Sequence, residues 1–113
     1  MLTWFSRARA PDPELDRLRN AAVLAWIRVC PDDGRLAAFL DGVAAGRRRE
    51  VRRSARAIRK ATEAFPGHRT ARLRPDAASY HAALHDHLKA RFPWMSDDTF
   101  ATLKLYSDWS GWR

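Results

Sequence analysis

The chain has one cysteine, three lysines and no apolar run close to twenty residues, and these shortages exclude several classes of protein. A single cysteine cannot form an internal disulfide framework. A membrane-spanning helix needs about 20 consecutive apolar residues, so we expect no spanning segment and no membrane partner. The apolar stretch at residues 2–5 is short and precedes the nearest positive residues, unlike a signal peptide, so we expect a cytoplasmic protein.

The residues that are present predict one helical domain. The chain has 113 residues, of which 46% are hydrophobic, so it can form a single core and is not disordered as a whole. Apolar residues recur every three or four positions, and no segment alternates with period two, which favours an all-α fold of about five helices. We expect one compact domain over 1–113, with an N-terminal arm (1–11), a basic amphipathic helix (47–65) and aromatic-rich helices (76–113).

Capping and breaking residues predict where the helices begin and end. Asp12 followed by proline indicates the start of a first helix over about 13–29. A break is expected near Gly46, the basic helix ends before Pro66, and Ser96 caps the last helix. The residues expected to face the core include Trp26, Leu36, Leu40, Val51, Ala55, Ile58, Thr62, Tyr80, Leu84, Leu88 and Leu103.

Arginine makes up most of the positive charge, and its distribution is uneven. The chain holds 18 Arg and 20 Ala, a pairing typical of a GC-rich genome, so we expect a bacterial source and some background arginine. Residues 47–74, however, contain eleven basic and two acidic residues, a net charge of +9, whereas the other 85 residues have a net charge of −1. Uniform background does not explain a single block that holds the whole excess.

The basic helix predicted over 47–65 has two contrasting faces. Its apolar residues are spaced four, three, four and three apart and form one narrow stripe. The opposite arc carries Arg49, Arg52, Arg53, Arg56, Arg59 and Lys60, and the connector that follows adds Arg69 and Arg72. Like charges at these spacings each destabilise a helix by a few tenths of a kcal/mol, so the arc indicates a surface that meets negative charge.

Phosphate is the anion that this arc fits best, since the planar arginine fork binds two oxygens at once. The sequence therefore favours a non-enzymatic module that binds nucleic acid or another polyanion. Six contacts to duplex phosphates would reduce affinity roughly a thousandfold between 50 and 200 mM salt. The alternative is a solvated face that is partly neutralised by Asp32, Asp33 or Asp41. The apolar stripe is too narrow to favour binding to a membrane surface.

The C-terminal third is rich in aromatic residues and offers a second hypothesis. We expect Phe92, Trp94 and Phe100 to pack in the core with Leu103. The patch formed by Leu105, Trp109 and Trp112 either closes over the core or binds a partner. A second copy of the chain would then give a homodimer, and an acidic protein could instead bind the basic helix.

Histidine and cysteine give little indication of catalysis. His81 and His85 are four residues apart on one predicted helix and could share a metal ion, but the sequence indicates no third ligand. Cys30 has no evident histidine partner, and we find no catalytic motif. A metal-dependent function is therefore the least favoured hypothesis, and we expect neither a cofactor nor an enzyme.

Overall fold

Asp12 caps the first helix, α2 (Pro13–Trp26), in a computed structural model that describes residues 12–28, 30–65 and 77–110. The Asp12 Oδ1 atom accepts a hydrogen bond from the Leu15 amide at 3.0 Å, and this bond lowers the pKa of the carboxyl group. The predicted helix over 13–29 is too long, because Ile27 adopts extended backbone and forms an isolated bridge with Pro31.

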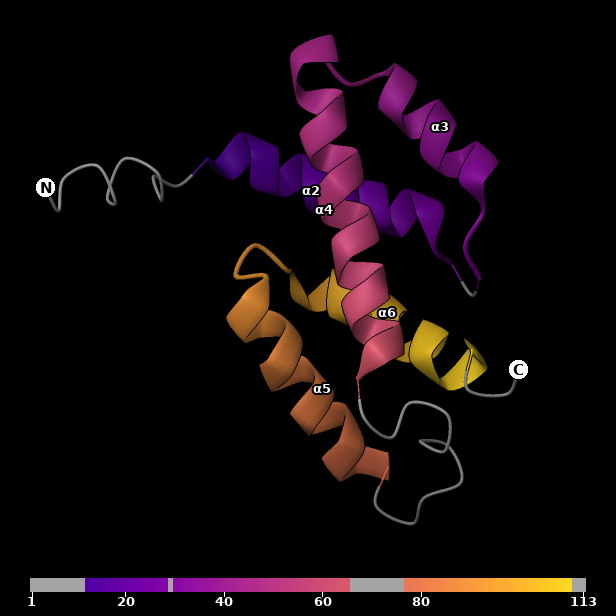
Figure 1. Cartoon of the computed structure of the whole chain (residues 1–113), viewed down its shortest axis with the longest axis vertical. Coiled ribbons are helices and arrows are strands. Elements are labelled where there is room, and N and C mark those ends of the chain that lie inside the picture. The colour runs from indigo at the N-terminus through magenta and orange to yellow at the C-terminus, as the bar shows by residue number, and fades with distance from the viewer. Residues whose placement is uncertain (1–11, 29, 66–76, 111–113) are drawn as a thin grey trace, which may run out of the picture.

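The described residues form five helices and no strand, which confirms the all-α prediction (Figure 1). After α2 come α3 (Asp33–Asp41), α4 (Ala45–Ala64), α5 (Ala77–Arg91) and α6 (Asp97–Ser110). They pack into one compact globule.

The helix boundaries follow the capping residues closely. Asp32 and Ser96 cap α3 and α6, where their side-chain oxygens accept the Arg35 and Thr99 amides at 3.1 and 3.2 Å. The predicted break near Gly46 falls slightly earlier, at residues 42–44, and Gly46 itself lies in the first turn of α4.

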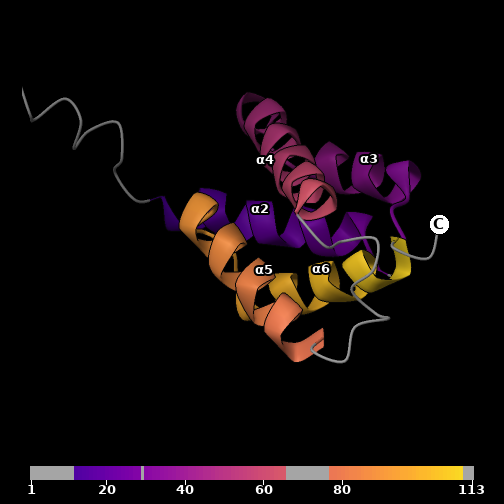
Figure 2. The ribbon, with the colours of Figure 1, turned by 60° about the horizontal axis from the view of Figure 1, so that its bottom comes forward.

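Helix α4 lies across α2 and α6 and contacts both (Figures 1 and 2). In the predicted stripe, Val51, Ala55, Ile58 and Thr62 are fully buried, whereas Phe65 at its end is only partly buried against the core. The opposite side of α4 is left open to solvent. Buried residues of every helix contribute to the core, among them Trp26, Leu36, Leu40, Tyr80, Leu84, Leu88 and Leu103, as predicted.

Polar bonds join α2 and α5 to the C-terminal helix. The Asn20 side chain in α2 binds the turn that precedes α6: it donates to the Trp94 carbonyl at 2.7 Å and accepts a hydrogen bond from the Ser96 amide at 2.9 Å. The buried Tyr80 hydroxyl in α5 bonds the Ser107 hydroxyl in α6 at 2.9 Å. These bonds fix the relative positions of the helices that support α4.

The N-terminus of α4 has none of the usual stabilising residues. Ala44 occupies the N-cap and supplies no side-chain hydrogen bond, and the first turn contains no acidic residue. Arginines at 47–49 instead lie close to the positive end of the helix dipole, where positive charge is unfavourable.

Replacing Ala44 with serine should therefore raise the free energy of unfolding by about 1 kcal/mol, since the serine oxygen can accept a free amide of the first turn. Urea denaturation measures the change. Ala45→Ser places the same hydroxyl one residue later, where it cannot cap, and should give no gain. Equal effects of the two substitutions would contradict the prediction.

Candidate functional site

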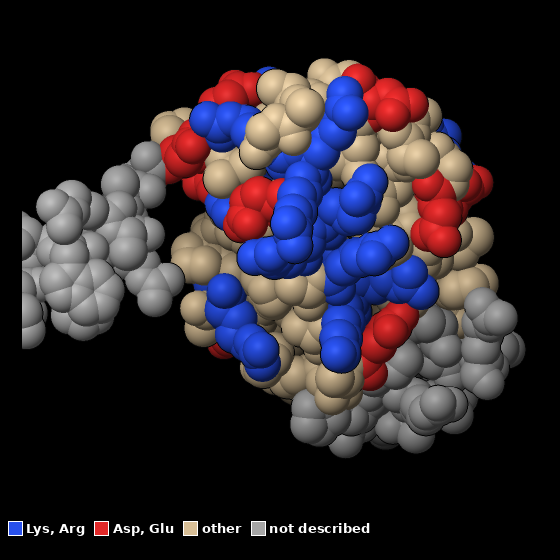
Figure 3. Space-filling model, turned by 45° about the horizontal axis from the view of Figure 1, so that its top comes forward, with Lys and Arg blue, Asp and Glu red and all other residues tan. Residues whose placement is uncertain are grey.

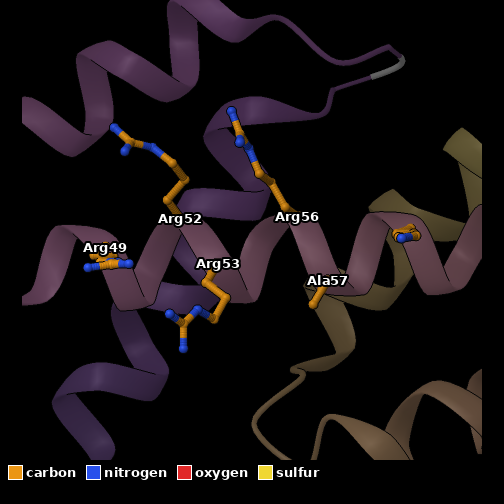
Figure 4. A pocket seen from close by; sticks show the side chains of 6 residues that line it. Arg49, Arg52, Arg53, Arg56 and Ala57 are labelled. Atoms are coloured by element: carbon orange, nitrogen blue, oxygen red, sulfur yellow. The ribbon is translucent and has the colours of Figure 1, made fainter.

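Five cations of α4 line one hollow on the open side of the helix. The hollow has a volume of about 520 Å³, and we call it the basic hollow; its lining residues are Arg49, Arg52, Arg53, Arg56, Ala57 and Lys60. All six are exposed. The Lys and Arg surface is continuous across this face, with Asp and Glu at its margins (Figure 3). Arg52 and Arg56 extend to one side of the α4 axis and Arg53 to the other (Figure 4).

The cations of the basic hollow have few negative partners. Arg53 approaches Glu50, but at 4.0 Å, and Glu50 also binds Arg19 at 2.9 Å. Within the described part of the chain, the other four cations form no ion pair and no side-chain hydrogen bond. None of these four charges is therefore neutralised by direct contact with a carboxylate of the described residues.

Of the three acidic residues that could neutralise this face, Asp32 and Asp33 bind other groups. Asp32 pairs with Arg35 at 3.3 Å, and Asp33 accepts a hydrogen bond from the Trp26 indole at 3.0 Å. Asp41 forms no ion pair with any described residue. Asp32 also caps α3, whereas the Asp33 carboxylate binds the Trp26 side chain.

Two arginines at the start of α4 form bonds with other residues of the protein. Arg47 binds the Asp12 carboxylate at 3.0 Å and so joins α4 to the start of α2. Arg48 donates to the carbonyl oxygens of Val43 and Asp41, at 2.8 and 3.2 Å, and satisfies acceptors at the end of α3. Neither side chain belongs to the basic hollow.

The structure places Arg59 apart from the five other predicted cations. Its Nε atom donates to Glu63 at 3.1 Å and to the Tyr106 hydroxyl at 3.3 Å. Its guanidinium carbon lies 4.9 Å from the ring centroid of Trp26. Tyr106 donates its own proton to Glu63, and burial together with this bond raises the pKa of Tyr106.

A second hollow of about 270 Å³ adjoins the basic hollow and shares Arg56 and Lys60 with it. We call it the mixed hollow, because aromatic, acidic and basic side chains line it together. Its other lining residues are Trp26, Asp33, Arg59 and Glu63. Sequence reasoning missed it, since its members come from α2, α3 and α4 and no motif connects them.

The predicted partner patch is exposed at Leu105, whose exposed fraction is 55%. Trp109 is only half-buried and packs against the core, with its ring 6.0 Å from that of Tyr106. Leu103 is fully buried as predicted, whereas Phe92, Trp94 and Phe100 are partly buried at the edge of the core. Trp112 of the patch, and Arg69 and Arg72 of the basic connector, lie outside the described residues.

The two candidate metal ligands bind different neighbours. The His81 Nε2 atom lies 2.9 Å from the Asp108 carboxylate, and the His85 ring packs edge-on against Phe100 at 4.8 Å. Within the described residues, no group of three or more potential ligands gathers. Cys30 is exposed as a free thiol.

Among the described helices, none is both long and apolar enough to cross a membrane. Comparison with models of protein families, with curated proteins and with solved structures finds no match.

Proposed function

We propose that the protein is a non-enzymatic module that binds nucleic acid through the basic hollow of α4. The observation that carries this proposal is the gathering of five exposed cations in one hollow of about 520 Å³. Arginine binds phosphate through two parallel hydrogen bonds, and lysine binds it as a point charge. The spacing along one helix lets several cations contact successive phosphates.

The energetics of α4 support the same proposal. Its N-terminus lacks a cap, and its neighbouring cations repel one another, so the helix is less stable than its length would allow. A bound polyanion would relieve the repulsion and stabilise the folded chain by mass action. The buried stripe and the bonds of Arg47, Arg48 and Arg59 hold the helix in place while its open face remains accessible.

Binding of this kind sets affinity rather than sequence choice, because phosphates carry no sequence code. We propose that the protein meets its nucleic acid in the cytoplasm of a bacterial cell. An acidic protein surface is the alternative ligand for the same hollow, and would compete with nucleic acid for it. The exposed Leu105 side chain favours a second candidate, which is self-association through that patch.

A salt series tests the proposal. If all five cations contact duplex phosphates, the logarithm of the association constant should fall with the logarithm of salt concentration with a slope of about −4.5. Arg52→Ala, Arg53→Ala and Arg56→Ala together should reduce the slope to about −2 and weaken binding at 50 mM salt at least tenfold. Fluorescence anisotropy with labelled duplex and single-stranded oligonucleotides measures both quantities.

A matched triple variant distinguishes the effect of the charges in the basic hollow from the effect of the total charge of the protein. Arg17, Arg28 and Arg91 are exposed, lie outside α4, and their replacement by alanine removes the same three charges. This control should retain the steep slope and most of the affinity. Absence of binding to any oligonucleotide at 50 mM salt, or equal losses in the two triple variants, would contradict the proposal.

A further inference from the structure

The mixed hollow differs from the basic hollow in size and in chemistry. Its volume of about 270 Å³ lies just below the range of roughly 300–1,000 Å³ typical of sites for drug-sized ligands. A single planar heterocycle is a better match for it than a whole nucleotide. Because the two hollows share Arg56 and Lys60, a ligand in the mixed hollow can remain connected to phosphates bound in the basic hollow.

The Arg59 side chain lines the mixed hollow and is held by neighbouring groups. The Arg59 guanidinium carbon lies 4.9 Å from the centroid of the Trp26 ring and 5.7 Å from that of Tyr106, and its Nε atom donates to Glu63 and to the Tyr106 hydroxyl. Arginine planes and aromatic rings are the platforms on which unstacked bases pack in single-stranded nucleic acid complexes. Because Arg59 is already ordered, stacking on it costs little further side-chain entropy.

The mixed hollow also holds two carboxylates with oxygen atoms to spare. Asp33 uses Oδ1 to accept the Trp26 indole, and Glu63 uses Oε2 to accept Arg59 and Tyr106. Within the described part of the chain, Asp33 Oδ2 and Glu63 Oε1 accept no hydrogen bond. An ionised carboxylate can only accept, so a ligand that contacts these atoms has to offer N–H or O–H groups, and phosphate is repelled.

We propose that the mixed hollow binds one unstacked base of a single-stranded nucleic acid and favours guanine. The inference rests on the proposed function, since the phosphates beside that base would bind in the basic hollow. Guanine presents its ring N–H and its amino group side by side, and a carboxylate can accept both. Uracil and thymine present two carbonyl oxygens, which the carboxylates repel. In a duplex the same base edge is already paired, so the site selects single strands.

Anisotropy with labelled nine-residue oligonucleotides tests the inference. The probes are an all-uracil RNA, the same RNA with one central guanine, the corresponding thymine-based DNA pair, and a duplex of the guanine-containing DNA. At 50 mM salt the guanine-containing single strands should bind about tenfold more tightly than the probes without guanine. The preference should appear in RNA and DNA alike, because the base carries it.

Two conservative variants test whether the carboxylates of the mixed hollow cause the preference for guanine. Asp33→Asn retains the oxygen that accepts Trp26 and replaces the other by an amide, and Glu63→Gln makes the same change on α4. Each should reduce the guanine preference to less than threefold and leave binding of the all-uracil RNA no weaker. Asp41→Asn removes one exposed carboxylate of α3 that does not line the hollow, and should retain the full preference. Thermal denaturation checks that each variant is folded.

The failures of the two proposals are distinguishable. If no oligonucleotide binds at 50 mM salt, the proposed function itself is overturned. If all probes bind with equal affinity, or if the guanine preference persists in both Asp33→Asn and Glu63→Gln, the base site is overturned and the phosphate-binding surface stands. Tighter binding to the duplex than to its guanine-containing single strand would also overturn the base site.

Discussion

Replacing Asn20 with alanine should lower the free energy of unfolding by about 3 kcal/mol. The Asn20 Oδ1 atom accepts the Ser96 amide at 2.9 Å and the Thr99 hydroxyl at 2.6 Å, and its Nδ2 atom donates to the Trp94 and Asp16 carbonyls. Each intramolecular hydrogen bond contributes about 1 kcal/mol net, and groups left without a partner cost more when water cannot reach them. The substitution removes four bonds, three of which link α2 to the start of α6 and the turn before it.

Urea denaturation measures this loss, and Ser96→Ala provides the comparison. Ser96 lies at the same junction, but its Oγ atom makes only the cap to the Thr99 amide and a bond to the Thr99 hydroxyl. Its replacement should cost about 1 kcal/mol, the usual value for an N-cap. If Asn20→Ala costs no more than Ser96→Ala, solvent replaces the lost bonds and the junction depends on Asn20 less than the contacts indicate.

Two leucines of α6 should respond very differently to the same substitution. Leu103 is fully buried, and Leu103→Ala should lower the free energy of unfolding by about 3 kcal/mol, through lost transfer energy and the cavity that remains. Leu105 is 55% exposed, and Leu105→Ala should change the monomer's stability by less than about 0.5 kcal/mol. Both residues lie in the middle of one helix, so the change in helix propensity is the same.

Urea denaturation at two protein concentrations tests the pair and the self-association candidate together. A monomer has the same midpoint at both concentrations, whereas a dimer is more stable at the higher one. If the patch mediates dimer formation, the wild type should show this dependence and Leu105→Ala should lose it. Equal losses from Leu103→Ala and Leu105→Ala in dilute solution would contradict the burial difference on which the comparison depends.

Most of the fold could be predicted because helices are specified locally. The spacing of apolar residues, the capping residues and the helix-breaking Pro and Gly lie within a few residues of one another. These signals predict all five helices to within a few positions. The stripe on α4 is a clear example, since Val51, Ala55 and Ile58 can share one face only if the segment is helical. Two boundaries differ from the prediction: extended backbone at Ile27 replaces the last turn of α2, and the break expected near Gly46 lies at residues 42–44.

The candidate site could be predicted only in part, because a helical wheel shows which face a residue occupies but not what lies opposite it. The wheel grouped Arg59 with the other cations, yet α6 passes beside it and provides Tyr106, 47 positions further along the chain. Asp12 is likewise 35 positions from Arg47. Pairings over such distances depend on how the helices pack, and no local pattern encodes them.

The division of α4 into internal and open cations implies different tolerances to exchange between arginine and lysine. Arg48 donates from two different nitrogens to two carbonyl oxygens, and the Nε atom of Arg59 donates to both Glu63 and Tyr106. A lysine ammonium cannot reproduce either arrangement in the same geometry. The open positions make no such fixed bonds within the described residues, and Lys60 already occupies one of them; a lysine there keeps the positive charge but loses the planar fork. Lysine should therefore be tolerated at most of the open positions, whereas Arg48 and Arg59 should not tolerate it.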